Sequence, residues 1–387
     1  MNSREREDRY TLATYNHLRF PIELVRGRGS WVEDDRGERY LDLYGGHAVC
    51  QIGHSHPRWV EDMRRQLDEL VFYSNTVYCD LRGRAAEALV TRSYPSMVGA
   101  YFSCSGADAN ETALKIARKA TGRSYIVAMD KGFHGRTIGA LSATGYAKMR
   151  DAFPENVAQW SRFVPFGDLA AIEALDPAEI AAIILEPVQS VAGVYVAPPS
   201  YYRALREHCD RHGICLIFDE VQTGSGRTGK WYAGHHWGVE PDLVTTAKGV
   251  GGGMPVGVVI ANEKIARTVA PGDQATTFGG GPLAMAAIVS TYRIIEEEGL
   301  VDRVAKRSEE LRSRLLELPR VREVRGLGYL LGIETDRPAK DVQAAFLEDR
   351  ILVGTSSEPS TMRLLPPLTV ADDEWEIFLA AARRVLG

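Results

Sequence analysis

The sequence contains little that would tie this protein to disulfide, metal or thiol redox chemistry. It has five cysteines, an odd number, and none of them forms a C-x-x-C pair. We therefore interpret them as reduced, mostly buried small side chains, and we expect no metal site. The cysteines are Cys50, Cys79, Cys104, Cys209 and Cys215.

Long hydrophobic runs and blocks of one charge are also missing. No apolar stretch approaches the roughly 18 residues of a membrane span. The first residues, M-N-S-R-E-R-E-D-R-Y, are charged where a signal peptide is apolar. The net charge of -5 over 387 residues is small and is not segregated. These absences predict a cytoplasmic protein that binds neither membranes nor nucleic acid.

What the chain does have is the composition of an ordinary globular enzyme, with 45% hydrophobic and 25% charged residues. Between about residues 84 and 262, helical patterns alternate with short apolar strands. Such alternation predicts an α/β fold in which helices cover both faces of a mostly parallel sheet. The predicted strands are G-A-Y-F-S-C, S-Y-I-V-A-M, A-A-I-I-L-E, C-L-I-F-D-E, D-L-V-T-T-A and V-G-V-V-I-A.

The remaining segments predict a second, smaller lobe. Turn signals separate short strand-like pieces in the first forty or so residues, and short strands and helices return from about Val321 to the end. We predict an N-terminal segment (1–45) that joins a small α+β domain (291–387), and a large domain (46–290) between them.

Two residues at predicted strand ends carry the strongest chemical signal. Lys248 stands in T-T-A-K-G-V-G-G-G, about thirty positions after Asp219 in L-I-F-D-E-V-Q-T-G. A buried lysine has a lowered pKa and can form a Schiff base with an aldehyde cofactor. A buried aspartate can pair with a protonated pyridine nitrogen. Together they indicate pyridoxal phosphate (PLP), although either residue alone would more often be a surface lysine or a helix cap.

A phosphate-binding turn is predicted where the first of these strands meets a helix. In Y-F-S-C-S-G-A-D-A-N-E, Ser105, Gly106 and Ala107 would present backbone N–H groups and a hydroxyl at a helix N-terminus, which favours an anion. Thr277, beside glycines in A-T-T-F-G-G-G-P-L, could complete the site. Read separately, the two segments are a capped helix and a turn.

Further polar and aromatic residues follow neighbouring strands. Phe133 could stack on a planar cofactor, and Arg136 could bind a carboxylate in two hydrogen bonds. Glu186 and Gln189 lie just past another strand, where polar groups are typical of a site rather than of a core. After Asp219, Val221 could pack under a ring and Gln222 could reach its phenolic oxygen.

Several ordered segments carry a resemblance to a known family. They resemble the class III (fold type I) PLP-dependent aminotransferases, and within that family the acetylornithine and ornithine aminotransferases. The similarity covers nearly the whole chain, and it implies a seven-stranded large domain and a homodimer. The segments are S-G-A-D-A-N-E, F-H-G-R-T, L-E-P-V-Q, I-F-D-E-V-Q-T-G-S-G-R-T-G, T-A-K-G-V-G-G-G-M-P and T-T-F-G-G-G-P-L-A.

The resemblance implies a role for each matching residue. Lys248 would hold the cofactor and move the substrate proton, while Asp219 would pair with the pyridine nitrogen. Arg136 and Arg363 would bind substrate carboxylates, and Thr277 would reach the phosphate from the neighbouring subunit. The other implied cofactor contacts are Ser105, Gly106, Ala107, Phe133, Glu186, Val221 and Gln222.

At the substrate end the chain departs from the family's pattern. Ornithine-type members carry a glutamate in the loop after E-P-V-Q that masks the C-terminal arginine, and here that position is Val191. Valine cannot neutralise Arg363, so we expect Arg363 to be available for a carboxylate in both half-reactions. Ordinary loop variation, with Arg363 paired to another acid, is the alternative. Trp31 replaces the tyrosine of ornithine-type relatives at the substrate entrance, and Tyr78 keeps the family's aromatic residue.

The predicted activity is ping-pong transfer of an amino group from an amino-acid donor to a 2-oxo acid, with 2-oxoglutarate as the expected acceptor. A racemase, aminomutase or decarboxylase on the same scaffold would share Lys248 and Asp219. A non-catalytic cofactor-binding protein would not need both of them. The sequence does not name the donor, because a single methylene changes discrimination by only about 1–3 kcal/mol.

Overall fold

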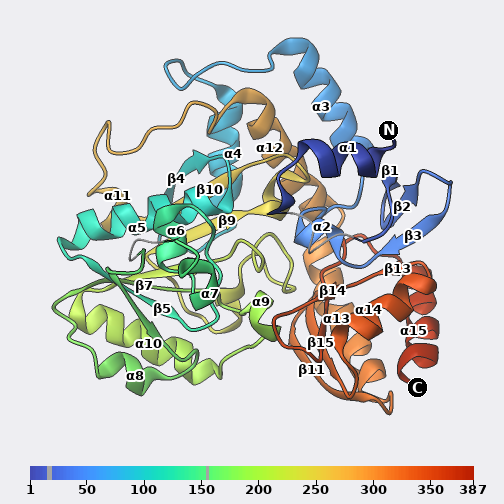
Figure 1. The fold of residues 1–387 in the computed structure, drawn as a ribbon. Helices are drawn as coiled ribbons and strands as arrows, with labels where there is room; N and C mark the ends of the chain where they lie inside the picture. Colours follow the sequence, from blue (N-terminus) through green and yellow to red (C-terminus); the bar gives the residue numbers. More distant parts are fainter. Residues whose placement is uncertain (15–19, 154–156) are drawn as a thin grey trace.

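The larger part of the molecule is built on one seven-stranded sheet (Figure 1). The computed structural model describes residues 1–14, 20–153 and 157–387. The strand order is β4-β10-β9-β8-β7-β5-β6, in which β10 is antiparallel to both neighbours and the other pairs are parallel. The strands are β4 (Met97–Ser103), β5 (Tyr125–Met129), β6 (Ser161–Val164), β7 (Ile180–Leu185), β8 (Cys215–Asp219), β9 (Leu243–Ala247) and β10 (Gly257–Asn262).

This sheet confirms the predicted α/β class and all six strands identified from the sequence. The seventh, β6, is a short edge strand whose first and last residues are buried and whose two middle residues are more exposed. Its four residues are too few to give a clear periodic pattern, and they were not predicted as a strand.

Helices cover both faces of the sheet because its central strands are apolar on both sides. In β8, Leu216 and Phe218 pack in a core with residues of α10 (Pro199–His212). Ile217, between them, packs in a different core with residues of α5 (Gly106–Thr121). The parallel strands have their carboxyl ends at one edge of the sheet. Helix α5 starts just after β4.

Helix α12 (Pro282–Glu297) connects the sheet to the smaller part of the molecule. Met285 and Ile288 pack with strand residues of the large sheet, including Val258. Ile294 and Ile295 pack in the core of the C-terminal part instead. The predicted boundary at residue 290 falls inside this helix, and the division into domains stays a prediction.

The smaller part contains two four-stranded sheets. The first has the order β1-β2-β3-β13 and the second β11-β12-β15-β14. Strand β13 pairs in parallel with β3, so that Ile351 lies opposite Leu41 and the two ends of the chain share one sheet. This agrees with the predicted small domain built from both termini. The strands are β1 (Leu24–Arg28), β2 (Trp31–Asp34), β3 (Arg39–Asp42), β11 (Val321–Leu327), β12 (Leu330–Thr335), β13 (Ile351–Leu352), β14 (Gly354–Thr355) and β15 (Thr361–Leu364).

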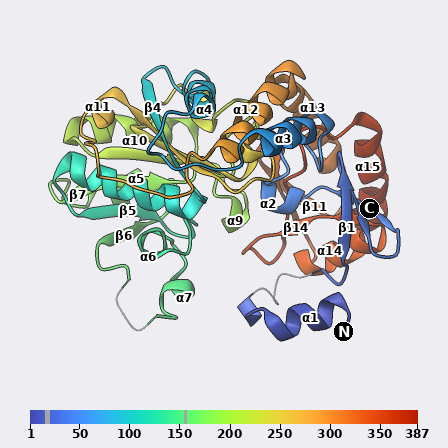
Figure 2. The same cartoon turned by 90° about the horizontal axis from the view of Figure 1, so that it is seen from above.

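The other elements are short or lie at the surface. Figure 2 shows the N-terminal helix α1 at the edge of the molecule, and none of its residues is buried. The remaining helices are α1 (Ser3–Tyr10), α2 (Gly45–Ala48), α3 (Pro57–Glu69), α4 (Asp80–Val90), α6 (Ile138–Ser142), α7 (Ala147–Arg150), α8 (Leu169–Glu173), α9 (Ser190–Gly193), η2 (Ala233–His236), η3 (Lys248–Gly251), α11 (Glu263–Ala266), α13 (Leu300–Leu316), α14 (Ala339–Glu348) and α15 (Asp372–Leu386).

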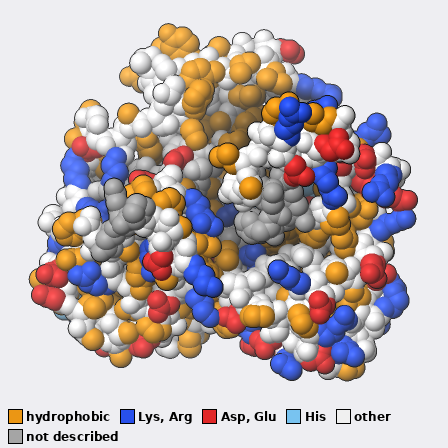
Figure 3. All heavy atoms as spheres, in the orientation of Figure 1, with side chains coloured by type: hydrophobic (Ala, Val, Ile, Leu, Met, Phe, Trp, Pro, Cys, Tyr) orange, Lys and Arg blue, Asp and Glu red, His pale blue; other side chains and the backbone are white. Residues whose placement is uncertain are grey.

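Lys, Arg, Asp and Glu side chains are interspersed over the face in Figure 3. Within the described ranges, no helix combines the length and hydropathy needed to cross a membrane.

Gly257 in β10 lets the strand pass close to the turn that precedes α5. A Cβ atom at this position would lie 2.0 Å from the carbonyl oxygen of Ser105. We expect Gly257→Ala to lower the free energy of unfolding by about 1–3 kcal/mol, because overpacking forces backbone shifts. Urea denaturation measures this. The matched control is Gly99→Ala in the adjacent β4, where an added Cβ would meet no atom within 4 Å. Equal effects of the two substitutions would contradict this account.

Candidate active site

A cavity of about 460 Å³ lies at the carboxyl ends of the parallel strands. This is the size of a small-molecule site. Residues that follow five different strands line it, which is where open α/β sheets bind ligands. Among the lining residues are Ser105, Gly106, Ala107, Phe133, Arg136, Glu186, Asp219, Val221, Gln222 and Lys248. The structure thus brings together every predicted cofactor residue except Thr277.

Lys248 follows β9 directly and opens the short helix η3. Its φ of 48° is in the left-handed region, which is strained for a residue with a side chain. Burial lowers the pKa of the Lys248 amine, although Asp219 and Glu186 nearby act in the opposite direction. In the described part of the chain, no side-chain hydrogen bond or ion pair engages the amine. The site therefore holds an amine that is not committed to another group and that burial makes easier to deprotonate.

Asp219 ends β8 and is 3% exposed. Its Oδ1 accepts a hydrogen bond from the N–H of Val221 at 3.1 Å. Its Oδ2 accepts one from Asn110 Nδ2 at 2.7 Å and lies 2.7 Å from His134 Nδ1. These contacts fix the orientation of the carboxylate.

Asn110 and His134 are site residues that sequence reasoning missed. Asn110 also donates to the carbonyl of His134 and accepts from Thr245 Oγ1 at 2.6 Å, so its amide is fully oriented. Both residues stand inside quoted motifs, S-G-A-D-A-N-E and F-H-G-R-T. The sequence signal that could have identified them is a further polar side chain in the same motif as a predicted cofactor residue.

The N-terminus of α5 forms one wall of the cavity. Ser105 caps the helix, its Oγ accepting from the N–H of Asp108 at 3.2 Å and donating to Asp108 Oδ2 at 2.9 Å. The first N–H groups of a helix have no partner within the helix and attract anions. At Gly106 a Cβ would lie 3.1 Å from Val221, so a larger residue would narrow this end of the cavity.

Glu186 connects the loop after β5 with the start of α9. It is 4% exposed, and its Oε1 accepts from the N–H of Phe133 at 2.9 Å. Its Oε2 accepts from the N–H of Ser190 at 3.3 Å. Burial raises the pKa of Glu186 to about 7. The Ser190 hydroxyl donates to Gln222 Oε1 at 3.0 Å, which leaves the Gln222 amide nitrogen available. Gln189 is turned away and donates to the carbonyl of Asp130.

Arg363, in β15, is a guanidinium that is only 5% exposed. It donates from Nε to the carbonyl of Thr355 at 2.7 Å, from Nη1 to Ser190 Oγ at 3.0 Å and from Nη2 to Tyr44 Oη at 3.2 Å. Across residues 1–14, 20–153 and 157–387, no acid forms an ion pair with it. Burying a guanidinium without an anion is costly, so a bound carboxylate would be favoured beside it.

Val191, in α9, follows the serine that Arg363 contacts. Its carbonyl accepts from the N–H of Ser357 at 2.8 Å. The neighbouring acid, Glu358, pairs with Lys131 at 2.6 Å instead of with Arg363. The alternative raised by the sequence, in which Arg363 pairs with another acid, therefore has no support in this geometry.

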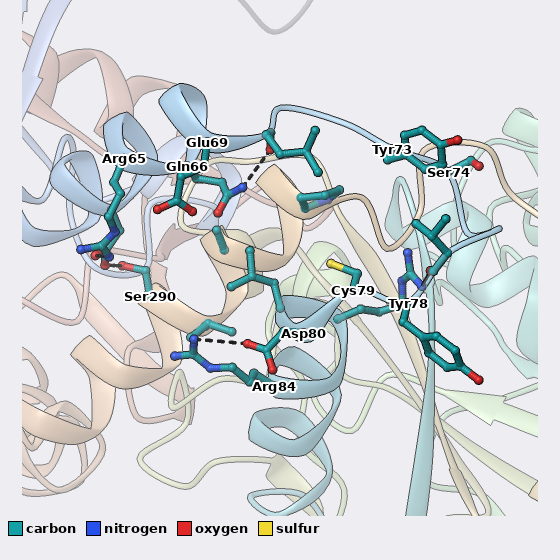
Figure 4. Close-up of a pocket in the computed structure, with 18 of the residues that line it drawn as sticks. Arg65, Gln66, Glu69, Tyr73, Ser74, Tyr78, Cys79, Asp80, Arg84 and Ser290 are labelled. Atoms are coloured by element: carbon teal, nitrogen blue, oxygen red, sulfur yellow. Dashed lines mark hydrogen bonds and ion pairs between the residues drawn. The ribbon is translucent and has the colours of Figure 1, made fainter.

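The structure places the other predicted substrate residues differently. Arg136 lines the cavity, and its guanidinium carbon lies 5.7 Å from the centre of the Phe133 ring. Trp31 does not line it, because its Nε1 donates to Glu374 at 2.7 Å in the smaller part of the molecule. Tyr78 is fully exposed and lies in a separate groove (Figure 4). Thr277 is exposed on a neighbouring loop.

The cavity suits PLP in three respects. Lys248 offers the amine, Asp219 offers a carboxylate for a pyridinium nitrogen, and the N-terminus of α5 offers an anion site. Phe133 and Val221 also line the same space, so a planar ring would meet an aromatic and an aliphatic side chain.

Comparison with known proteins identifies the family of this chain. The family model for class III aminotransferases matches residues 13–386. The acetylornithine aminotransferase of Methanopyrus kandleri is 44% identical over 98% of this chain and 97% of its own length. The Bacillus subtilis acetylornithine aminotransferase is 40% identical over 92% of each chain.

Solved structures show the same fold. The ornithine aminotransferase of Toxoplasma gondii superposes with a TM-score of 0.92 at 29% identity, covering 99% of this chain and 93% of that one. The acetylornithine aminotransferase of Elizabethkingia anophelis has a TM-score of 0.86 at 29% identity, covering 99% and 97%. The chain therefore belongs to the class III aminotransferases, and it is a PLP-dependent enzyme of fold type I that transfers an amino group between an amino acid and a 2-oxo acid.

Proposed function

We propose that this enzyme transfers the amino group of an acetylornithine-like or other carboxylate-bearing amino acid to 2-oxoglutarate. The observation that carries this proposal is the buried Arg363, which donates to three neutral acceptors and forms no ion pair with an acid in the described part of the chain. A substrate carboxylate would supply the missing anion. The similarity to acetylornithine aminotransferases supports the donor class.

The residues of the cavity have separate proposed tasks. When bound, PLP supplies an electron sink that stabilises negative charge at the reacting carbon of the substrate. The Lys248 amine, with its pKa lowered by burial, would accept the proton from that carbon and deliver it to the cofactor carbon. Asp219 holds the pyridine nitrogen, and its own orientation comes from Asn110 and His134.

The remaining contacts bind and orient. Ser105, Gly106 and Ala107 would hold the phosphate at the N-terminus of α5, while Phe133 and Val221 would pack on the two ring faces. The free amide nitrogen of Gln222 would donate to the ring oxygen, and Arg136 would bind a second substrate carboxylate.

We also propose a homodimer in which Thr277 reaches the phosphate of the partner subunit. Thr276 is tied into its own chain, where its hydroxyl accepts from the N–H of Gly279. Thr277 is exposed, and its hydroxyl has no hydrogen bond to any residue that the structure describes. It is therefore free to serve a site other than that of its own chain.

An exposed apolar surface supports this assembly. The end of α3, the segment after it and the loop that contains Phe278 contribute several large side chains that are one third to fully exposed. The ring of Phe72, in the segment after α3, lies 5.2 Å from that of Phe278, next to Thr277. The same segment borders a groove of about 550 Å³ (Figure 4). Large exposed apolar patches are typical of interfaces. The side chains are Leu67, Leu70, Val71, Phe72, Tyr73, Val77, Tyr78 and Phe278.

A cytoplasmic location fits the proposed chemistry. All five cysteines are unpaired, as expected in a reducing compartment. Both proposed substrates are small metabolites.

The donor preference tests the function directly. With 2-oxoglutarate as acceptor, we expect glutamate or acetylornithine to exceed ornithine and 4-aminobutyrate in kcat/KM. In Arg363→Gln, the KM for glutamate should rise roughly 10- to 100-fold, since hydrogen bonds to charged groups contribute about 1.5–3 kcal/mol. The absorbance of lysine-bound cofactor, absent in Lys248→Ala, serves as the control for an intact site. An unacylated ω-amine that is the best donor by tenfold would refute the proposal.

The absence of a masking acid can be tested by adding one. Val191 follows Ser190, which Arg363 contacts at 3.0 Å. Val191→Glu should place a carboxylate beside Arg363 and raise the KM for glutamate at least about tenfold, because the guanidinium would then be paired. Val191→Gln has the same size without the charge and should change KM by less than about threefold. Similar effects of both variants would mean that bulk rather than charge matters here.

The shared site predicts complementation between subunits. Thr277→Ala should weaken PLP binding roughly 10- to 100-fold by removing a hydrogen bond to a charged group. In a hybrid of one Lys248→Ala chain and one Thr277→Ala chain, one site would contain both native residues. We expect that site to regain native affinity, measured by titration with PLP after subunit exchange. If Thr277 serves its own chain, the hybrid stays as weak as Thr277→Ala.

A further inference from the structure

The turn that follows β3 has an unusual backbone. Gly45, Gly46, His47 and Ala48 have φ values of 56°, 57°, 65° and 64°, so α2 is a left-handed turn. Left-handed helical geometry costs roughly 1–2 kcal/mol for each residue that has a Cβ. His47 and Ala48 both bear this cost. Such strain persists only where the surrounding structure enforces it, and it points to a function.

Several contacts hold the turn in place. Asp42 Oδ1 accepts hydrogen bonds from the N–H groups of Tyr44 and Gly45, both at 2.9 Å. Its Oδ2 lies 2.7 Å from His54 Nε2. Burial disfavours the His54 cation, but hydrogen bonds with Asp42 and Cys50 outweigh this and raise its pKa to about 10. At Gly45 a Cβ would lie only 2.6 Å from the carbonyl oxygen of Leu365, two residues after Arg363.

The strained turn brings His47 to Tyr44 and, through it, to Arg363. His47 Nδ1 lies 2.7 Å from Tyr44 Oη, and the two ring centres are 4.7 Å apart. Arg363 Nη2 donates to the same Tyr44 oxygen at 3.2 Å. An arginine can only donate, so the Tyr44 oxygen is an acceptor toward Arg363. When His47 Nδ1 carries no hydrogen, the Tyr44 hydroxyl donates its own hydrogen to that nitrogen.

The charges around these groups favour that arrangement. To accept from Tyr44, His47 must be neutral with its hydrogen on Nε2. Desolvation lowers the pKa of His47, and the cations of Arg363 and Lys248 lower it further. Burial raises the pKa of Tyr44, so its hydroxyl keeps the proton that it donates.

Two of the N–H groups of Arg363 remain for a ligand. A guanidinium has five N–H groups. Thr355 takes the one on Nε, Ser190 takes one on Nη1 and Tyr44 takes one on Nη2. One N–H remains on each terminal nitrogen, and two such N–H groups can bind a carboxylate in two hydrogen bonds.

We propose that Tyr44 and His47 are positioning residues for the carboxylate clamp. His47 draws the Tyr44 hydrogen to itself, and the Tyr44 oxygen then holds Arg363 with one N–H on each terminal nitrogen directed to the substrate. This inference rests on the proposed role of Arg363. It explains why the chain maintains a strained histidine beside a buried arginine.

The test measures binding of glutarate, a dicarboxylate without a reacting amine, to the PLP-loaded enzyme by calorimetry. Tyr44→Phe keeps the ring, and His47→Gly relieves the left-handed strain, so both variants should fold. We expect each to weaken glutarate binding roughly 3- to 10-fold, the range of one net hydrogen bond. The double variant should be no weaker than either single variant, because the two residues act in one chain. KM for glutamate should rise in parallel, with kcat changed much less.

Two further variants separate the possible outcomes. Tyr146→Phe removes a hydroxyl that bonds Ser357 at 3.0 Å without contacting Arg363, and it should bind glutarate like the native enzyme. Arg363→Gln should lose the binding. Native affinity in Tyr44→Phe and His47→Gly, with loss in Arg363→Gln, would overturn this inference alone. Additive losses in the double variant would also overturn it. Native affinity in Arg363→Gln would overturn the proposed function itself.

Discussion

The site depends on keeping a carboxylate buried at the end of a central strand. Asp219 has almost no contact with water, so its negative charge requires hydrogen bonds from the protein. Helix α5 supplies Asn110, the loop after β5 supplies His134, and the turn after β8 supplies the N–H of Val221. The same α5 presents its N-terminus to the cavity. The parallel strands thus place an anion site, a carboxylate and Lys248 around one space, because they all end at the same edge of the sheet.

At the substrate end the buried charge is positive. This cation, Arg363, has no anionic partner among the residues that the structure describes. Arg363 is satisfied by neutral oxygens only, and Glu358, the acid closest in sequence, is paired with Lys131. The cost of burying an unpaired guanidinium is offset when a carboxylate binds. Val191 preserves this state because it has no charge. In the proposed function, selectivity at this end would therefore depend as much on the missing acid at position 191 as on Arg363 itself.

The two parts of the chain cooperate to build that end. Arg363 comes from β15, near the C-terminus, whereas Tyr44 and His47 come from the turn after β3, near the N-terminus. The pairing of β13 with β3 holds these segments together. Helix α12 packs on both cores and links this unit to the large sheet. Contacts with a second subunit would add to this arrangement through the exposed segment between Leu67 and Tyr78.

The sequence by itself determined the sheet and the chemical centre. Strong apolar runs marked six strands, and Lys248, Asp219 and the turn at Ser105 followed them at positions where polar residues need a reason. The sequence does not predict the short strand β6, because four residues give little periodicity. Only the tertiary structure showed that Asn110 and His134 hold Asp219, that Trp31 bonds Glu374 away from the cavity, and that Tyr44 lies between His47 and Arg363. Local patterns reveal strands and helix starts, whereas a contact between residues 319 positions apart depends on how the elements pack.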